Sequence, residues 1–209
     1  FAKAMSKGPF VSVYAGGIAR DSAFFDADAT SFFPYNPAGA NALLDGLGLI
    51  DTDGNGIRNL ANGGGDLVIN LVQNKDSENE KLIGDGLATM MAEVGIKLNL
   101  KPMEDTEPTR QSGEWDWAIS RAQQEFAFPN SGYWSEMGPV TTSSFDPHMG
   151  SDEHPQQFQP FEKEIVSILE QWRDGVEGAE AQALMSRYQK LFTENVYMPG
   201  IVQYPTALL

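Results

Sequence analysis

The chain contains no cysteine and few basic residues, with 14 Lys and Arg against 29 Asp and Glu among its 209 residues. Without cysteine there are no disulfides, no thiolate metal ligands and no cysteine nucleophile, although oxidising and reducing compartments both stay open. The formal net charge of -15 excludes nucleic acid as a partner, because clusters of Lys and Arg bind phosphate backbones. An anionic membrane surface is disfavoured for the same reason.

Long apolar runs and a targeting segment are missing as well. No stretch approaches the roughly 20 apolar residues of a membrane-spanning helix. The chain starts at Phe1 without a basic and then apolar region, so we expect a targeting peptide to be absent, removed, or located upstream in a longer protein. With 41% hydrophobic and 11% aromatic residues, the composition is typical of a folded globular domain with a sizeable core.

The middle of the chain alternates between helix and strand signals. Asn36 and Pro37 indicate a helix start, because the Asn side chain can cap the helix and proline fits its first position. Gly95 is the expected end of a longer helix. This order predicts an α/β fold, a mixed β-sheet flanked by helices. The predicted helices are 37–48, 78–94 and 106–112, and the predicted strands are 66–73, 96–100 and 115–120, the last a central strand.

The remaining segments complete one predicted domain, residues 1–209. Residues 1–36 are rich in aromatic residues and are expected to lie as an extended segment on the domain, because each ring buries a large area. Residues 121–159 form a long loop region, and loops of this length are usually functional. Two helices, 160–173 and 178–195, follow. The apolar spacing of the first predicted helix places four residues on its buried face: Ala40, Leu43, Leu44 and Leu47.

The loop from Asp51 to Ile57 has two interpretations. Asp51, Asp53 and Asn55 alternate ahead of a glycine, as at the start of a calcium-binding EF-hand loop. However, the twelfth position is Asn62 and not a bidentate Glu. In the other interpretation, the Asp and Asn side chains of a tight turn bind their own backbone. Both interpretations stay open, with the turn favoured.

Other metal or catalytic sites are not indicated. His148 and His154 match no standard zinc spacing and are expected to be solvated loop residues. No Ser-His-Asp or paired-carboxylate arrangement can be proposed from the sequence. The function must therefore be inferred from the loops, the order of elements and the likeness to known families.

The chain resembles the extracellular solute-binding proteins of ATP-driven importers, the family (family 5) that includes the dipeptide and oligopeptide receptors. The likeness covers nearly the whole chain, and each motif is weak alone but specific in combination. The motifs that carry it are Tyr35-Asn-Pro37, Ala42-Leu-Leu44, Gly46-Leu-Gly-Leu49, the loop 51–57, the strand 66–73, Gly95-Ile-Lys-Leu-Asn-Leu100, Gly113-Glu-Trp-Asp116, and Glu194-Asn195 before Met198-Pro199.

The resemblance implies that the chain is only the C-terminal lobe, domain III of a two-lobed periplasmic-binding-protein-like fold. Such receptors are roughly twice as long or longer, since two lobes close around a ligand. The partners implied are a small solute, the membrane permease of the importer and the missing N-terminal lobe. The implied location is periplasmic or extracellular, with or without a membrane tether.

Ligand-binding residues are expected just after the strand 115–120, because ligands of open α/β sheets bind beyond the carboxyl ends of strands. Peptide receptors of the family typically carry an acidic residue there for the peptide's amino terminus, whereas this chain has Gln124, with Glu125 one step away. This polar and aromatic set would suit a sugar by hydrogen bonding and ring stacking. The candidates are Arg121, Gln123, Gln124, Glu125, Tyr133 and Trp134.

The function predicted is therefore that of a non-enzymatic receptor without a cofactor, which captures an oligopeptide or related solute for uptake. An oligosaccharide receptor of the same family is the alternative. Two alternatives of another class stay open: a glycoside hydrolase, which needs two carboxylates flanking a cleft, and an adhesion module stabilised by calcium at Asp51, Asp53 and Asn55.

Overall fold

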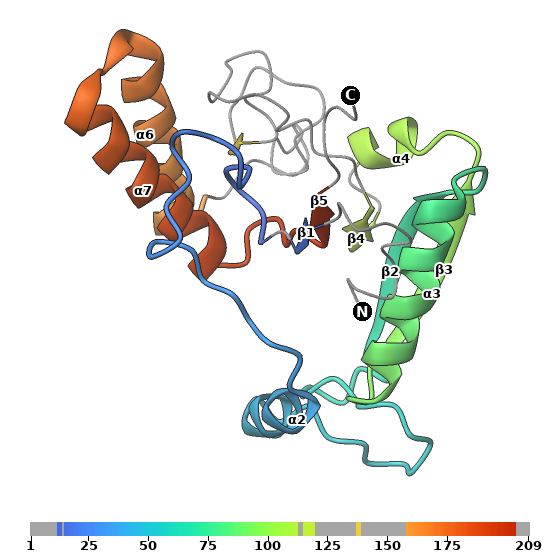
Figure 1. Ribbon diagram of the computed structural model, residues 1–209. Coiled ribbons are helices and arrows are strands. Elements are labelled where there is room, and N and C mark those ends of the chain that lie inside the picture. The colour runs from blue at the N-terminus through green and yellow to red at the C-terminus, as the bar shows by residue number, and fades with distance from the viewer. Residues whose placement is uncertain (1–11, 14, 113–114, 120–136, 139–157, 204–209) are drawn as a thin grey trace. The chain divides into compact units, whose positions relative to one another are not determined.

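The computed structural model describes residues 12–13, 15–112, 115–119, 137–138 and 158–203 (Figure 1). The chain divides into two compact units. Pro34–Ser120 form the first, here called the sheet unit, and Phe1–Phe33 with Arg121–Leu209 form the second, the helical unit. Within the described residues, no helix has the length and apolar character needed to cross a membrane.

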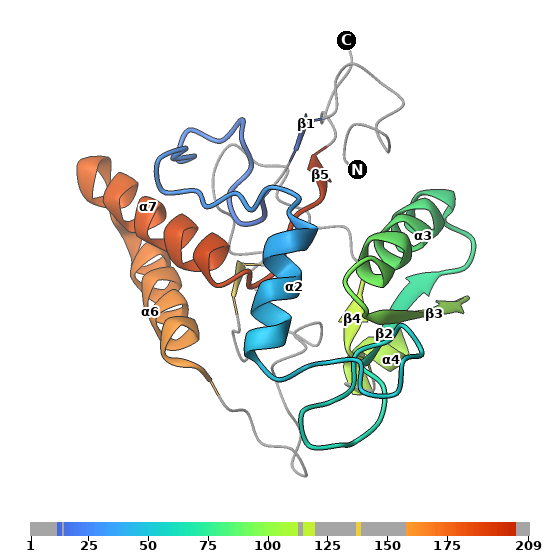
Figure 2. The same cartoon turned by 90° about the horizontal axis from the view of Figure 1, so that it is seen from below.

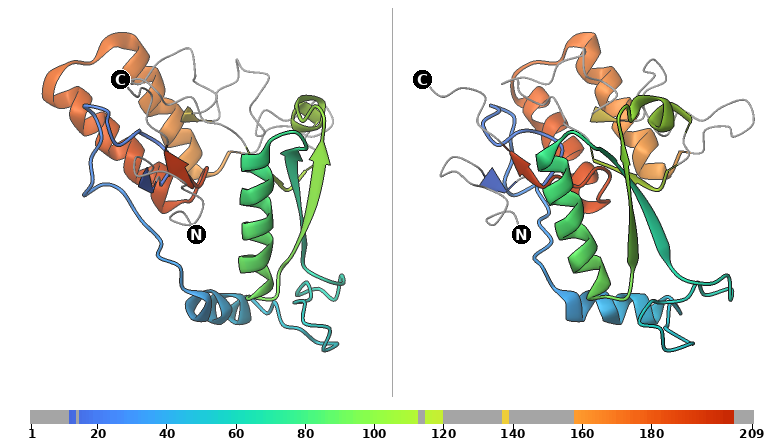
Figure 3. Two further views of the ribbon diagram at one scale, coloured as in Figure 1. Left: turned by 45° about the vertical axis from the view of Figure 1, so that its right-hand side comes forward. Right: turned by 90° about the vertical axis from the view of Figure 1, so that its right-hand side faces the viewer.

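A three-stranded parallel sheet is the centre of the sheet unit. Strand β2 (Val68–Asn74) lies in the middle, between β3 (Lys97–Met103) and β4 (Trp117–Ala118). Helix α3 (Glu78–Ala92) connects β2 to β3 and covers one face of the sheet (Figure 3). Helix α4 (Glu107–Ser112) connects β3 to β4. The predicted α/β class is confirmed.

The prediction that residues 115–120 form a central strand is wrong for the described residues. Only Trp117 and Ala118 pair there, and they lie at the edge of the sheet beside β2. The central strand is instead β2, whose Leu71 and Val72 point to opposite faces and are both buried. A strand in the middle of a sheet is covered by neighbours on both faces, which suits the apolar Leu71 and Val72 at this position.

Helix α3 begins at the predicted residue and ends before the predicted glycine, and its N-terminal cap is a residue that was not predicted. The Ser77 side chain accepts a hydrogen bond from the Glu80 backbone N–H at 3.3 Å, which caps the first turn. The chain leaves the helix at Gly95, whose φ of 74° suits glycine. Gly84 lets the helix approach the sheet, because a methyl group there would lie 2.1 Å from Gln73 Oε1 and 3.4 Å from Leu100.

Helix α2 (Pro37–Gly46) starts at the predicted cap, where Asn36 Oδ1 accepts the Gly39 N–H at 2.9 Å. The predicted buried face of α2, comprising Ala40, Leu43, Leu44 and Leu47, is wrong. No residue of the helix is buried, and the side chains of Leu43 and Leu47 are 73% and 69% exposed. The physical reason is that α2 is held through polar side chains on its other face.

Two long helices, α6 (Pro160–Gly175) and α7 (Gly178–Glu194), form the body of the helical unit and lie side by side (Figure 2). Both start and end close to their predicted positions. Their facing side chains form a buried apolar core that also includes Ile18 and Met137. The members contributed by the two helices are Ile165, Ile168, Leu169, Met185, Tyr188, Leu191 and Phe192.

The described part of the aromatic-rich segment lies on α7. The buried side chain of Gln189 accepts a hydrogen bond from Ile18 N at 2.7 Å and donates one to Gly16 O at 3.3 Å. Strand β1 (Ser12–Val13) pairs in antiparallel fashion with β5 (Val202–Gln203), which follows α7. Segments from the two ends of the chain are thereby joined in one unit.

The close packing of Gly16 leads to a stability prediction. Its φ is 96°, and a Cβ there would lie 2.3 Å from the Met198 carbonyl oxygen. Gly175 has nearly the same φ, 95°, with nothing within 4 Å. Gly175→Ala should therefore cost only the left-handed backbone strain, about 1–2 kcal/mol. Gly16→Ala should cost a further 1–3 kcal/mol of overpacking, roughly. Urea unfolding of both variants measures the difference, and equal losses would contradict the packing argument.

Candidate functional site

The carboxyl edge of the sheet is where a ligand is expected. Because β2, β3 and β4 are parallel, their last residues, Asn74, Met103 and Ala118, all lie at this edge. The chain continues from β4 through Ile119 directly toward the predicted ligand-binding residues. Those residues, Arg121, Gln123, Gln124, Glu125, Tyr133 and Trp134, lie outside the described residues. Their role as ligand contacts stays a prediction.

Several described polar groups at this edge bind one another. Lys75 Nζ lies 3.3 Å from Glu104 Oε2, an ion pair that links the ends of β2 and β3. The Asn74 backbone N–H donates to Glu80 Oε2 at 2.6 Å, and the Asn74 side chain accepts the N–H of Asp76 at 2.8 Å. These contacts stabilise the edge from which the chain leaves β4.

A polar row that was not predicted crosses the sheet. Asp116 Oδ2 accepts hydrogen bonds from the backbone and side chain of Asn70 at 2.7 and 2.9 Å, and Asn70 Oδ1 accepts one from the Asn99 side chain at 2.9 Å. Asn70 and Asn99 are paired in register, so the row ties all three strands together. Asn70 and Asn99, each flanked by apolar residues in its strand, were the signal that could have revealed it.

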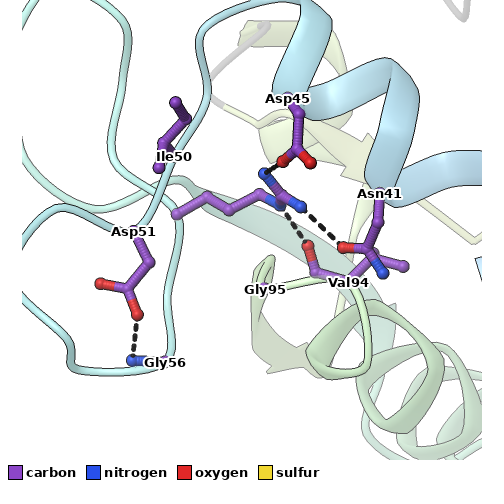
Figure 4. A pocket seen from close by; sticks show the side chains of 8 residues that line it. Asn41, Asp45, Ile50, Asp51, Gly56, Val94 and Gly95 are labelled. Carbon is purple, nitrogen blue, oxygen red and sulfur yellow. Dashed lines mark hydrogen bonds and ion pairs between the residues drawn. The ribbon is translucent and has the colours of Figure 1, made fainter. Parts of the chain in front are cut away.

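An open pocket of about 220 Å³ lies at the opposite edge, near the amino ends of β2 and β3 (Figure 4). It is formed by α2, the loop after it and the end of α3. Ligands of open α/β sheets bind at the carboxyl edge, so this position does not favour a solute site. The lining residues are Asn41, Asp45, Ile50, Asp51, Gly56, Arg58, Val94 and Gly95.

Arg58 forms the wall of this pocket and is only 8% exposed. Its guanidinium donates to Asn41 Oδ1 at 2.6 Å, to Asp45 Oδ1 at 2.6 Å and to the Leu49 carbonyl. Its Nε donates to the Val94 carbonyl at 2.7 Å. Hydrogen bonds therefore connect the guanidinium to α2, to the loop that follows it and to the end of α3. Arg58 is thus a structural centre of the sheet unit.

The loop from Asp51 to Ile57 has the hydrogen bonds of a tight turn. The two carboxylate oxygens of Asp51 accept the backbone N–H groups of Gly54 at 2.8 Å and Gly56 at 2.9 Å. Asn55 Oδ1 accepts the Ile57 N–H at 2.7 Å, and the Asn55 amide donates to Asp66 at 3.1 Å. The hydrogen bond from Gly56, followed by that from Gly54, lowers the pKa of Asp51 from 3.8, although desolvation opposes the shift.

Metal binding was predicted as an alternative use of this loop. Among the residues that the structure describes, no group of three or more His, Cys, Asp or Glu side chains is arranged to hold a metal ion. Asp51, Asp53 and Asn55 do lie in one short loop, and the hydrogen bonds of Asp51 and Asn55 to backbone N–H groups support the turn interpretation. His148 and His154 lie outside the described residues.

Comparison with a protein family gives a match over most of the chain. The model of the bacterial extracellular solute-binding proteins, family 5 middle region, matches residues 1–143. A periplasmic alpha-galactoside-binding protein of Rhizobium meliloti strain 1021 is 32% identical over 99% of this chain. The match spans only 30% of that relative's length.

Solved structures of similar fold agree with this match. The periplasmic binding protein MelB from Agrobacterium fabrum C58, in complex with stachyose, has a TM-score of 0.87 and 29% identity, over 98% of this chain and 32% of its own. A mannohexaose-bound periplasmic oligopeptide-binding protein from Thermotoga maritima has a TM-score of 0.71 and 16% identity, over 91% of this chain and 36% of its own. The second likeness shows the fold alone.

Loss of the Arg58 contacts should destabilise the chain. Arg58→Gln leaves Asp45 and two backbone carbonyls without their charged donor, so we expect it to lower the free energy of unfolding by about 3 kcal/mol. Lys81→Gln in the same unit is the matched control, since it breaks an exposed ion pair with Asp85 on α3 and should cost less than about 0.5 kcal/mol. Similar unfolding midpoints in urea for both variants would show that Arg58 is not a structural centre.

The turn hydrogen bonds of Asp51 predict a pH dependence. Because its folded pKa lies below 3.8, ionised Asp51 stabilises the native loop above that pH, and the stabilisation is lost as pH falls through the lowered pKa. The stability difference between the wild type and Asp51→Asn should therefore be full at neutral pH and shrink at pH values below 3.8. Urea unfolding across this range measures it, and a difference independent of pH would refute the turn assignment.

Thermal unfolding of the wild type and of Asp51→Asn tests whether the loop binds calcium. If the loop only forms a turn, the melting temperature of the wild type is the same in calcium and in chelator, because only a ligand of the native state raises it. A higher melting temperature in calcium, absent in Asp51→Asn, would instead support the metal site.

Proposed function

Because this chain belongs to the bacterial extracellular solute-binding proteins of family 5, we propose that it is part of a receptor that captures an oligosaccharide of the α-galactoside type for an ATP-driven importer. Its role is to bind the sugar and present it to the membrane permease, without chemistry. The receptor works in the periplasm or outside the cell. The relatives named above, which are periplasmic binding proteins, support this location.

One observation carries the choice of sugar over peptide. Among the relatives named above, the one that is 32% identical is an alpha-galactoside-binding protein, and the one that is 29% identical was solved with stachyose. Structures of oligopeptide-binding proteins, at 16% identity, support only the fold. The chain also has Gln124 where peptide receptors of the resembling family typically carry an acidic residue. A neutral amide suits sugar hydroxyls, because it both donates and accepts hydrogen bonds.

The proposed contacts rest on the position of the residues in the sequence, just after β4. Arg121, Gln123, Gln124 and Glu125 follow this parallel strand, and ligands of open α/β sheets bind beyond the carboxyl ends of strands. We assign these side chains to hydrogen bonds with sugar hydroxyls, and Tyr133 and Trp134 to stacking on the apolar faces of the sugar rings. The chain spans about a third of the relatives' length. The opposite wall of the site would therefore come from the rest of the receptor, which closes on the sugar.

Titration calorimetry on the full-length receptor tests this function. Stachyose should bind, whereas an oligopeptide of similar size should give no heat of binding. Arg121→Ala and Trp134→Ala should each weaken stachyose binding by roughly tenfold or more, since truncation of a buried arginine or aromatic contact commonly costs over 1 kcal/mol.

Arg173→Ala, at an exposed arginine of α6, is the matched control and should leave the affinity unchanged. Binding of the peptide without stachyose would make the receptor a peptide receptor. Unchanged stachyose affinity in both site variants would remove the assignment of these residues.

A further inference from the structure

Helix α2 is anchored through its polar face. Asn41 and Asp45, one turn apart, both accept hydrogen bonds from the buried Arg58 guanidinium at 2.6 Å (Figure 4). These side chains therefore point toward the body of the sheet unit. Successive residues of a helix are 100° apart around its axis, which places Leu43 and Leu47 on the side opposite to Asn41 and Asp45.

The outward face of α2 is apolar. Leu43 and Leu47 are 73% and 69% exposed. Leu44 and Ala40 are only partly buried, so no apolar residue of the helix enters a core. An amphipathic helix normally buries its apolar side, and grouped exposed leucines mark an interaction surface. We call Leu43 and Leu47 the leucine face.

We propose that the leucine face is a docking surface for the part of the receptor polypeptide that this chain does not contain. This rests on the proposed function only in taking the chain to be a portion of a longer receptor. The match covers 30% and 32% of two relatives' lengths. The remaining polypeptide is tethered to this chain, and tethering gives a high effective concentration for even a small apolar contact.

Other occupants are disfavoured by charge. The chain has a net charge of -15, so a second copy would bring a strongly like-charged surface to the contact. An anionic membrane surface would be repelled in the same way. An apolar segment of the same receptor is not repelled in this way, and its covalent connection to the chain keeps it close to the leucine face.

The experiment measures the accessibility of introduced cysteines. The chain has no cysteine of its own, so Leu43→Cys and Leu47→Cys each add one defined thiol to it. Both variants are made in the 209-residue chain and in the full-length receptor, and the rate of reaction with a soluble thiol reagent is measured. Asp85→Cys, at an exposed position of α3, is the control, and the unsubstituted full-length receptor corrects for any other thiols.

In the full-length receptor, both leucine-face thiols should react roughly tenfold or more slowly than in the 209-residue chain, because the docked segment must open first. Asp85→Cys should react equally in both. Equal rates for the leucine-face thiols in the two proteins would overturn the proposal. Protection that increases with protein concentration would overturn it in favour of a second copy.

The full-length variants are also titrated with stachyose. Sugar binding by a receptor whose leucine-face thiols are unprotected overturns this proposal and leaves the proposed function standing. Protection in a receptor that binds no sugar supports the docking surface and overturns only the proposed function.

Discussion

The sheet unit depends on one buried cation. Arg58 is 8% exposed, and its side chain hydrogen bonds to α2, to the loop that follows α2 and to Val94, just after the end of α3. Its backbone continues the same connection, since the Arg58 N–H donates to the Gly95 carbonyl at 2.7 Å. A guanidinium has five donors in a rigid plane, so one residue can hold several segments that share little apolar contact.

This arrangement also determines what the neighbouring residues can be. Gly95 must lack a side chain, because a Cβ there would lie 2.9 Å from Arg58 Cγ, and its φ of 74° is itself a glycine conformation. The Asp51 turn follows α2 closely and lines the same pocket. Its carboxylate is occupied with the N–H groups of Gly54 and Gly56. The amino edge of the sheet is therefore a region of structural hydrogen bonds.

Local signals predicted most of the elements, since caps and helix ends are decided by neighbouring residues. Asn36 and Gly95 act as their chemistry indicates. Predictions that needed tertiary information failed. The apolar spacing of α2 suggested a buried Leu43 and Leu47, but nothing in the local sequence shows that a distant arginine binds the polar face of the helix. The edge position of Trp117 likewise depends on strand order, which periodicity does not encode.

The strand order indicates where a ligand site is expected, but a long loop defines its own contacts, so the site residues stay a prediction. The α2 helix shows a second limit, because its apolar spacing is typical of a buried face and yet Leu43 and Leu47 are exposed. Burial of an apolar face lowers the free energy whether its partner lies within these 209 residues or outside them. An anchored polar face opposite an exposed leucine face is therefore the arrangement that the proposed docking to the rest of the receptor would explain.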